Sequence, residues 1–156
     1  MPTTRVDIDS FLGHHRIAMV GLSRDPKHFS RYLLKELSTR GYDVVAVNPS
    51  ASEIEGSPCF ANVKAIEPPV DAALVMTPPA ETVSVVQDCA AAGIREVWMH
   101  RGGGQGAGSQ VAVALCREKG IRVVEGECPL MFLPNTQFPH RVHGFIKKLV
   151  GSFPRA

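Results

Sequence analysis

Five short apolar runs alternate along the chain with segments of helical periodicity, and no other feature of the sequence restricts the fold as strongly. The runs cover residues 16–21, 43–47, 71–76, 96–99 and 121–124. Their apolar residues are nearly continuous, whereas a strand with one face in water alternates apolar and polar residues. Strands buried on both faces need helices on each side, so the pattern predicts a parallel sheet in a doubly wound α/β fold.

Three segments of helical spacing lie between these runs. The first follows Asp25 and Pro26, which we expect to cap it, and ends at Gly41. The other two cover about residues 81–92 and 109–119, and a glycine follows each. Residues 54–69 are too irregular for a full helix, and we expect a short turn or strand there. The sequence therefore predicts one Rossmann-like domain over residues 1–130, with a five-stranded, mainly parallel sheet.

The remaining residues, 131–156, are predicted to form a tail that packs on the same domain. Its apolar residues follow the spacing of an amphipathic helix: Phe138, Val142, Phe145, Ile146 and Leu149. This apolar face would cover an edge or a helical layer of the domain, or it would form the contact of a homodimer. The sequence leaves both alternatives open.

Charge and composition exclude several classes of function. The 156 residues have a net charge of +2 and no lysine or arginine block, which disfavours nucleic-acid and membrane-surface partners. Every apolar run is far shorter than the roughly 20 residues of a membrane span. The N-terminus lacks the apolar core of a signal peptide, and the four cysteines form no C-x-x-C pair. We expect a cytoplasmic protein with free thiols.

The segments that follow the predicted strands are the expected ligand site. In doubly wound sheets, ligands bind beyond the carboxyl ends of the strands, near the point where the strand order reverses. These segments are rich in glycine, proline and small polar residues, which let backbone N–H groups approach a ligand: residues 21–24, 48–50, 77–79, 100–102 and 127–129. Basic residues near the first segment favour an anionic ligand: Arg24, Lys27, His28 and Arg31.

The usual nucleotide motifs are incomplete in this chain. A dinucleotide-binding fingerprint needs G-x-G-x-x-G after the first strand, and here Gly21 is the only glycine of that turn. The second strand ends at Asn48, which is neither a carboxylate for an NAD ribose nor a basic residue for a 2′-phosphate. The glycine cluster after residue 101 lacks the lysine and hydroxyl of a Walker motif. NAD(P) is therefore disfavoured, and an NAD(P)-binding regulatory domain stays an alternative.

Seven sequence pieces, in this order and spacing, resemble the coenzyme-A-binding domain family. They are VGLS at 20–23, Ser30, GYDVVAVNP at 41–49, GSPCF at 56–60, VD at 70–71, GIREVW at 93–98 and ECPL at 127–130. The family includes small stand-alone bacterial proteins. The same domain forms the N-terminal part of the succinyl-CoA synthetase α subunit and of nucleoside-diphosphate-forming acyl-CoA synthetases. The resemblance covers about residues 17–128.

The resemblance implies that the chain binds coenzyme A or acyl-CoA, as a sensor or as a partner subunit of another protein. It implies that Gly21 and Ser23 face the phosphates and that Asn48 and Pro49 line the nucleotide pocket. Other implied binding residues lie in the same loops: Leu22, Arg24, Lys27, His28, Ser30, Thr77, Pro78, Pro79, His100 and Gly102. Which basic residue meets the 3′-phosphate is left open, with Arg24, Lys27 and Arg31 as candidates.

The sequence argues against a complete catalytic apparatus. The related synthetases use a phosphorylated histidine in a second domain, and this sequence ends at Ala156, so we expect no acyl-phosphate chemistry from this chain alone. His100, as an acid or base, and Cys128, as a thiol, leave a small acyl-transfer or redox enzyme as a further alternative. His140 and His143 have helical spacing, but no further ligands complete a metal site, so we expect none.

Overall fold

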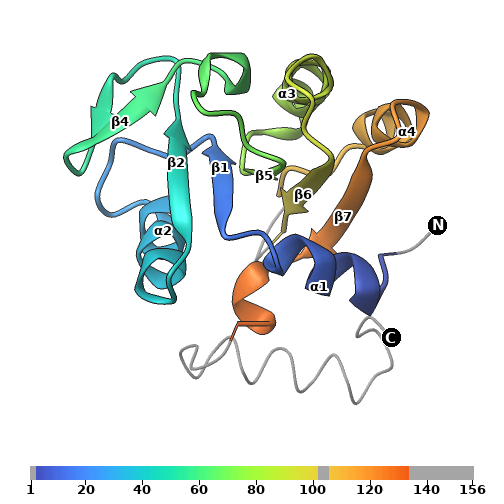
Figure 1. The fold of residues 1–156 in the computed structure, drawn as a ribbon, viewed down its shortest axis with the longest axis horizontal. Coiled ribbons are helices and arrows are strands. Elements are labelled where there is room, and N and C mark those ends of the chain that lie inside the picture. Colours follow the sequence, from blue (N-terminus) through green and yellow to red (C-terminus); the bar gives the residue numbers. More distant parts are fainter. Residues whose placement is uncertain (1–2, 102–105, 134–156) are drawn as a thin grey trace.

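The computed structural model describes residues 3–101 and 106–133 and contains one mixed sheet between two layers of helices (Figure 1). The sheet has seven strands in the order β3-β4-β2-β1-β5-β6-β7. All neighbouring strands are parallel except β3 and β4, which form an antiparallel hairpin at one edge. The doubly wound α/β prediction is confirmed, and the predicted count of five strands is wrong.

The strands match the predicted apolar runs closely, with two additions. They are β1 (Arg16–Val20), β2 (Asp43–Val47), β3 (Glu53–Ile54), β4 (Ser57–Phe60), β5 (Ala72–Val75), β6 (Glu96–His100) and β7 (Arg122–Glu127). The two additions, β3 and β4, lie in the segment where a short turn or strand was expected. Both strands are short, and their sequences mix polar and apolar residues. β3 is the edge strand of the sheet and pairs on one side.

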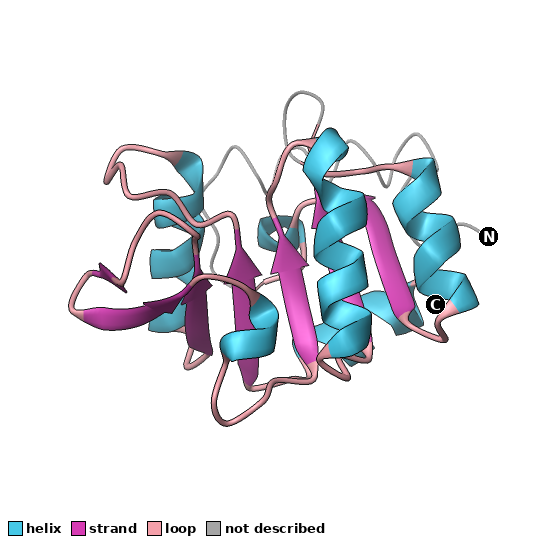
Figure 2. Ribbon diagram, turned by 90° about the horizontal axis from the view of Figure 1, so that it is seen from above, coloured by secondary structure: helices cyan, strands magenta, loops and turns pink. Residues whose placement is uncertain are grey.

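Helices cover both faces of the sheet. They are α1 (Arg5–Leu12), α2 (Phe29–Thr39), α3 (Pro79–Ala91) and α4 (Gln110–Glu118), with short 3₁₀ turns η1 (Val63–Ala65) and η2 (Pro129–Met131). α1 and α2 lie on one face, and α3 and α4 lie on the other, as the view from above also shows (Figures 1 and 2). The sequence analysis did not predict α1, whose start is fixed by a capping box between Thr4 and Asp7.

Successive residues of the central strands point to opposite faces and enter two separate apolar clusters. Ile17 and Met19 of β1 pack with α1 and α2, whereas Ala18 and Val20 pack with α3 and α4. The largest buried side chain is Trp98 of β6, which is fully buried on the α1 and α2 face. Its indole N–H donates a hydrogen bond of 3.0 Å to the Glu127 carbonyl. Both faces are therefore closed, as the apolar runs require.

The predicted cap of α2 is wrong. Asp25 and Pro26 form a turn before the helix, in which the Asp25 carboxylate accepts a hydrogen bond of 2.9 Å from the Lys27 N–H. The N-cap is His28, whose Nδ1 accepts a hydrogen bond of 3.1 Å from the Ser30 N–H. The imidazole does here what a serine or aspartate side chain does at most helix starts, and sequence preference alone does not indicate it.

Part of the domain prediction falls outside the described residues. The amphipathic helix expected in the tail, with His140 and His143, lies in residues 134–156, and Gly102 lies in the other undescribed stretch. The boundary at residue 130 therefore stays a prediction. In residues 3–101 and 106–133, no helix is long and apolar enough to cross a membrane.

Two buried thiols make the fold less stable as the pH rises into the alkaline range. Burial raises the pKa of Cys89 to about 12, with Cys116 and Asp88 as smaller causes, and burial raises the pKa of Cys116 to about 11. The folded state therefore holds these protons more tightly than the unfolded chain, where a thiol has a pKa near 9.0. The corresponding stability is complete below pH 9 and is lost as the pH rises towards 12.

We expect the Cys89→Ala variant to lose less stability than the wild type between pH 8 and pH 10.5. Urea unfolding at a series of pH values measures this difference in slope. Val113→Ala is the matched control, because Val113 is 2% exposed in the same cluster and does not titrate. The control should be less stable at every pH and keep the wild-type slope. Parallel curves for the wild type and Cys89→Ala would contradict the assignment.

Candidate functional site

The strand order reverses between β1 and β5, and the segments that follow these two strands lie in close contact. Gly21 follows β1 with a φ of +90°, and its N–H donates a hydrogen bond of 3.1 Å to the Val47 carbonyl. A Cβ at Gly21 would lie 3.1 Å from the Met76 carbonyl carbon and 3.2 Å from the Thr77 nitrogen. A glycine is required here for both its backbone conformation and its size, and the first loop can therefore lie against the loop after β5.

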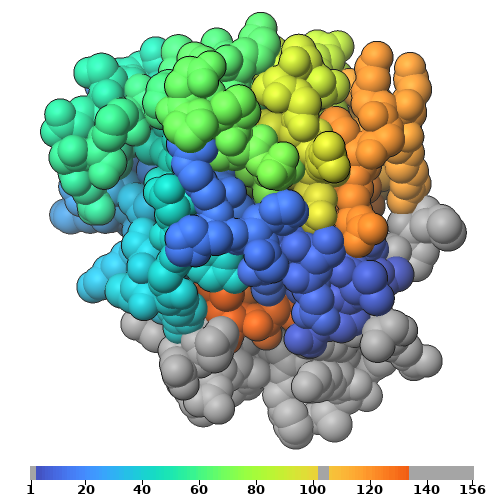
Figure 3. Space-filling view, viewed as in Figure 1, coloured from blue at the N-terminus to red at the C-terminus, as the bar shows by residue number. Residues whose placement is uncertain are grey.

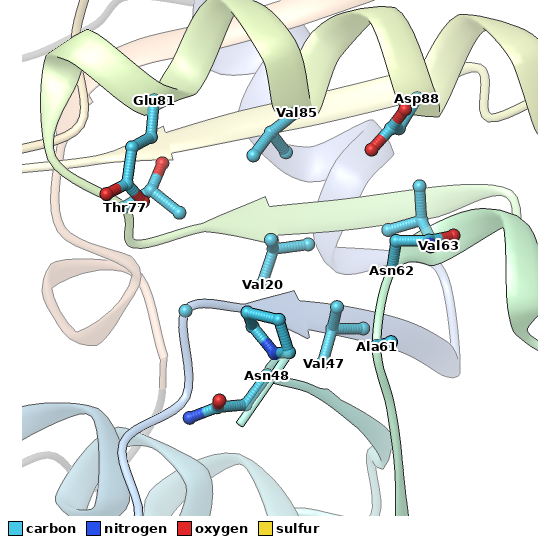
Figure 4. Close-up of a pocket in the computed structure, with 12 residues that line it drawn as sticks. Val20, Val47, Asn48, Ala61, Asn62, Val63, Thr77, Glu81, Val85 and Asp88 are labelled. Carbon is cyan, nitrogen blue, oxygen red and sulfur yellow. The ribbon is translucent and has the colours of Figure 1, made fainter. Parts of the chain in front are cut away.

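A cavity of about 210 Å³ opens at this reversal point, at the carboxyl ends of β1, β2 and β5. Four valines form its walls (Figure 4): Val20 from β1, Val47 from β2, Val63 from η1 and Val85 from α3. Backbone and polar groups of the first loop, the β2 end and the β5 end complete it: Gly21, Asn48, Pro49 and Thr77. This combination of apolar walls and a few polar groups is typical of a small-molecule pocket.

Polar side chains stand at two ends of this cavity. Asp88 points from α3 towards the segment of Asn62 and Val63, while Glu81 lies near Thr77 at the other end (Figure 4). The Asp88 carboxylate forms an ion pair of 3.4 Å with Lys64, and both side chains are partly exposed. The Asn62 side-chain oxygen accepts from the Lys64 N–H at 2.9 Å, so its amide nitrogen remains to donate.

Asn48 links the ends of the first two parallel strands. Its amide nitrogen donates a hydrogen bond of 2.9 Å to the Leu22 carbonyl, and its oxygen accepts one of 2.7 Å from the Ser50 N–H. Both functional atoms of the side chain are thus bonded within the protein. Asn48 borders the cavity as a residue that positions the loops, and the same bonds explain why an amide stands where dinucleotide-binding folds carry a carboxylate.

A chain of hydrogen bonds fixes the loop between β1 and α2. The Ser30 hydroxyl is fully buried, accepts a hydrogen bond of 2.9 Å from the Ser23 N–H, and lies 2.8 Å from His28 Nδ1. Since Nδ1 also accepts from the Ser30 N–H, this nitrogen carries no proton, and the imidazole N–H is at Nε2. Ser30 therefore holds the loop from inside, and its implied place near the ligand stays a prediction.

Beside this loop, a groove of about 630 Å³ runs along α2 towards the β3–β4 hairpin. Its cationic lining consists of Lys27, Arg31 and Lys35, together with His28. The Arg31 guanidinium is already bonded, at 2.6 Å to Glu55 Oε1 and at 3.0 Å to the Arg24 carbonyl. Lys27 is exposed and forms no ion pair among the described residues. The groove thus offers Lys27, Lys35 and the His28 Nε2 to an anion.

The loop after β5 is held to the loop after β6. Thr82 is fully buried in the first turns of α3, and its hydroxyl lies 2.8 Å from the Ala107 carbonyl and 3.1 Å from the Thr77 hydroxyl. Pro78 and Pro79 stand at the N-cap and first position of α3. The Thr-Pro-Pro segment is therefore rigid and keeps Thr77 at the cavity.

The two candidate reactive residues are both buried. His100 is the last residue of β6, not a loop residue, and is 8% exposed; its ring lies 5.4 Å from that of Phe29. Cys128 is 2% exposed in the cluster beneath α1 and α2. A nucleophile or base has to reach its substrate, and this burial does not favour the enzyme alternatives. The described residues also hold no group of three or more metal-binding side chains.

The structure gathers some of the predicted binding residues and adds others. Gly21, Asn48, Pro49 and Thr77 line the cavity, and Lys27 and His28 line the groove. Leu22 is fully buried beneath the loop, and Arg24 is exposed on it. The sequence analysis missed the segment after β4 and the inner face of α3: Ala61, Asn62, Val63, Glu81, Val85 and Asp88. The signal available for α3 was the helical spacing of residues 81–92, which does not indicate that its inner face lines a cavity.

Comparison with known proteins identifies this class of fold and site. Residues 15–134 match the model of the CoA-binding domain family, which is most of the chain. The chain therefore belongs to the CoA-binding domain family, as the resemblance predicted.

Three similar proteins represent this family and its relatives. An uncharacterized protein from Bacillus subtilis, YneT, is 28% identical over 113 residues, which are 72% of this chain and 81% of that protein. The α subunit of an ADP-forming acetate–CoA ligase from Pyrococcus furiosus is 26% identical over 78% of this chain, but the match spans only 28% of that subunit. The solved structure of a conserved hypothetical protein from Pyrococcus furiosus is 30% identical, with a TM-score of 0.67, covering 73% of this chain and 95% of that one.

The contact at Gly21 predicts that adding one methyl group there lowers the stability of the fold strongly. We expect Gly21→Ala to lower the free energy of unfolding more than Gly41→Ala, measured by urea denaturation. Both glycines have a φ of +90°, but a Cβ at Gly41 would meet nothing within 4 Å. The control should therefore lose about 1–2 kcal/mol from backbone strain, and Gly21→Ala should lose more because its Cβ crowds the Met76–Thr77 peptide. Equal losses would contradict this account.

Proposed function

We propose that this chain binds coenzyme A, with the adenine in the valine-walled cavity and the phosphates outside it along the β1–α2 loop. The observation that carries the proposal is the position of the cavity, at the reversal of strand order and next to a cationic groove. The two are joined by the loop from Gly21 to His28. A ligand with a flat apolar end and several phosphate groups fits that pair of sites.

The cavity suits adenine by shape and by hydrogen bonding. Its walls are the branched side chains of four valines, which pack well against an aromatic ring. At one end, the Asp88 carboxylate can accept from the exocyclic amine of adenine, and the Asn62 amide nitrogen can donate to a ring nitrogen. The carboxylate of Glu81 at the other end disfavours a phosphate inside the cavity.

The phosphates of coenzyme A would therefore lie on the groove side of the loop. Arg31 is bonded to Glu55 and to a backbone carbonyl. Of the other donors in the groove, Lys27 and the His28 Nε2 lie in the loop that joins it to the cavity, and we propose them for the dianionic 3′-phosphate. Among the three basic residues that the sequence left open, we propose Lys27 for this contact.

The competing functions have less support. An NAD ribose needs an acceptor at the end of β2, and both polar atoms of Asn48 are bonded to Leu22 and Ser50. Acyl transfer or redox chemistry would need His100 or Cys128, which are 8% and 2% exposed. We therefore propose a binding module, and its role as a sensor or as a partner subunit for another chain depends on this binding.

Filling the cavity should abolish binding. We expect coenzyme A to bind the wild type at micromolar affinity or tighter, and NADH and NADPH to bind far more weakly, as measured by isothermal titration. Val85→Phe should weaken coenzyme A binding at least tenfold, because the larger ring occupies the adenine position. Val111→Phe is the control, since Val111 is 67% exposed on α4. Wild-type affinity in Val85→Phe would overturn the adenine position.

Removing the Lys27 ammonium should weaken only the binding of the 3′-phosphate. We expect Lys27→Ala to weaken coenzyme A binding about tenfold, the loss of one charge-assisted hydrogen bond. Its affinity for 3′-dephospho-coenzyme A should stay unchanged. Lys119→Ala, at the end of α4, removes an exposed lysine elsewhere and controls for net charge. An equal loss for both ligands would show that Lys27 serves another part of the ligand.

A further inference from the structure

We propose that Arg31 is a positioning residue that holds the phosphate side and the base side of the site in one arrangement, without touching the ligand. The inference rests on the proposed coenzyme A binding and concerns how that site is assembled. The sequence suggests Arg31 as a phosphate ligand, but in the structure its guanidinium is bonded to the protein on two sides.

One side of this clamp is the β1–α2 loop. Arg31 Nη1 donates a hydrogen bond of 3.0 Å to the Arg24 carbonyl and lies 3.5 Å from the Ser23 carbonyl. A peptide carbonyl and the following N–H point in opposite directions. Fixing the Arg24 carbonyl therefore also fixes the Asp25 N–H, which donates to the Ser23 hydroxyl at 3.1 Å. Arg31 thus stabilises one conformation of the loop proposed to hold the phosphates.

The other side of the clamp is the β3–β4 hairpin. Arg31 Nη2 donates to Glu55 Oε1 at 2.6 Å, and Glu55 has a φ of +51° in the turn of the hairpin. β4 is held to the sheet by two residue pairs with β2, those of Cys59 and Phe60. The hairpin lies over α2 at the left of the molecule (Figures 1 and 3).

The hairpin matters to the site because the chain enters the cavity wall directly after it. Residues 61–63 follow β4 and line the cavity, and Val63 is one of its four valines. A shift of the hairpin would therefore move this wall relative to Val47 on β2. The Arg31–Glu55 ion pair couples the cavity wall at residues 61–63 to the loop at Ser23 and Arg24. These two segments are far apart in the sequence.

The burial of the Arg31 side chain supports a positioning role. The Arg31 side chain is 9% exposed, and its Nε is buried without a hydrogen-bond partner among the described residues. The Glu55 side chain is 58% exposed. The guanidinium charge is thus balanced within the protein by a carboxylate and by carbonyl oxygens. Its planar fork is suited to bonding two segments at once, which the single ammonium of lysine does not do.

Arg31→Ala should weaken coenzyme A and 3′-dephospho-coenzyme A by the same factor, about tenfold, so that the ratio of the two affinities stays at the wild-type value. Arg31→Lys should not restore the affinity, because it restores charge without the second contact. Arg40→Ala is the matched control: Arg40 is the C-cap of the same helix, nine positions after Arg31, and pairs with Glu36 at 2.7 Å. The control should bind both ligands as the wild type does.

Hydrogen exchange on the ligand-free protein tests the coupling without any binding. In Arg31→Ala, amides of residues 53–60 and of 23–28 should both lose protection. Glu55→Ala removes an exposed side chain and is less disruptive to the fold. It should also lower the protection of residues 23–28, although the hydrogen bond of Glu55 goes to Arg31. Arg40→Ala should leave both segments as protected as in the wild type.

The outcomes separate the possibilities. If Arg31→Ala loses affinity for coenzyme A alone, or if Arg31→Lys restores the wild-type affinity, the proposal is overturned and Arg31 is a direct phosphate ligand. Unchanged affinities and unchanged protection in Arg31→Ala and Glu55→Ala would also overturn it, since the clamp would then have no effect. If the wild type binds no coenzyme A, the proposed function fails, while coupled loss of protection in the ligand-free variants still supports the clamp.

Discussion

Burial of the central strands on both faces governs this structure. β1, β5 and β6 have no face in water, so apolar side chains of adjacent residues enter opposite clusters, and helices are needed on each side of the sheet. A chain that covers both faces must cross from one to the other, and the strand order then reverses between β1 and β5. The cavity lies at this reversal, so the position of the site follows from the packing of the core.

Polar side chains shape the site chiefly by bonding to backbone groups. Asn48, Ser30, Thr82 and Arg31 each hold a loop through hydrogen bonds to carbonyl or N–H groups. Buried polar groups need such partners, and loops with satisfied backbone groups keep one conformation. Asn48, Ser30 and Arg31, which look like ligands in the sequence, therefore already have partners within the protein. Pre-ordered loops of this kind lower the entropy lost on binding.

The strands and the family could be predicted because their signals are local. Continuous apolar runs, the glycines that follow helices and each of the family's motif pieces lie within short windows of sequence. The predicted bounds of β1 and β2 agree with the structure within a residue. A short turn or strand was expected where the β3–β4 hairpin lies, but its pairing as two strands of the sheet, the His28 cap and α1 were not predicted. The hairpin strands are only two and four residues long, and an imidazole is an unusual cap.

The sequence by itself determined the doubly wound fold, the edge of the sheet where the cavity lies, and membership of the CoA-binding domain family. Only the tertiary structure decided which residues meet at that edge. Val63 and Val85 join Val20 in one cavity although 43 and 65 positions separate them from it in the chain, and Arg31 is bonded to Glu55 across 24 positions. Contacts between distant segments depend on how the layers pack, and no local pattern of residues encodes them.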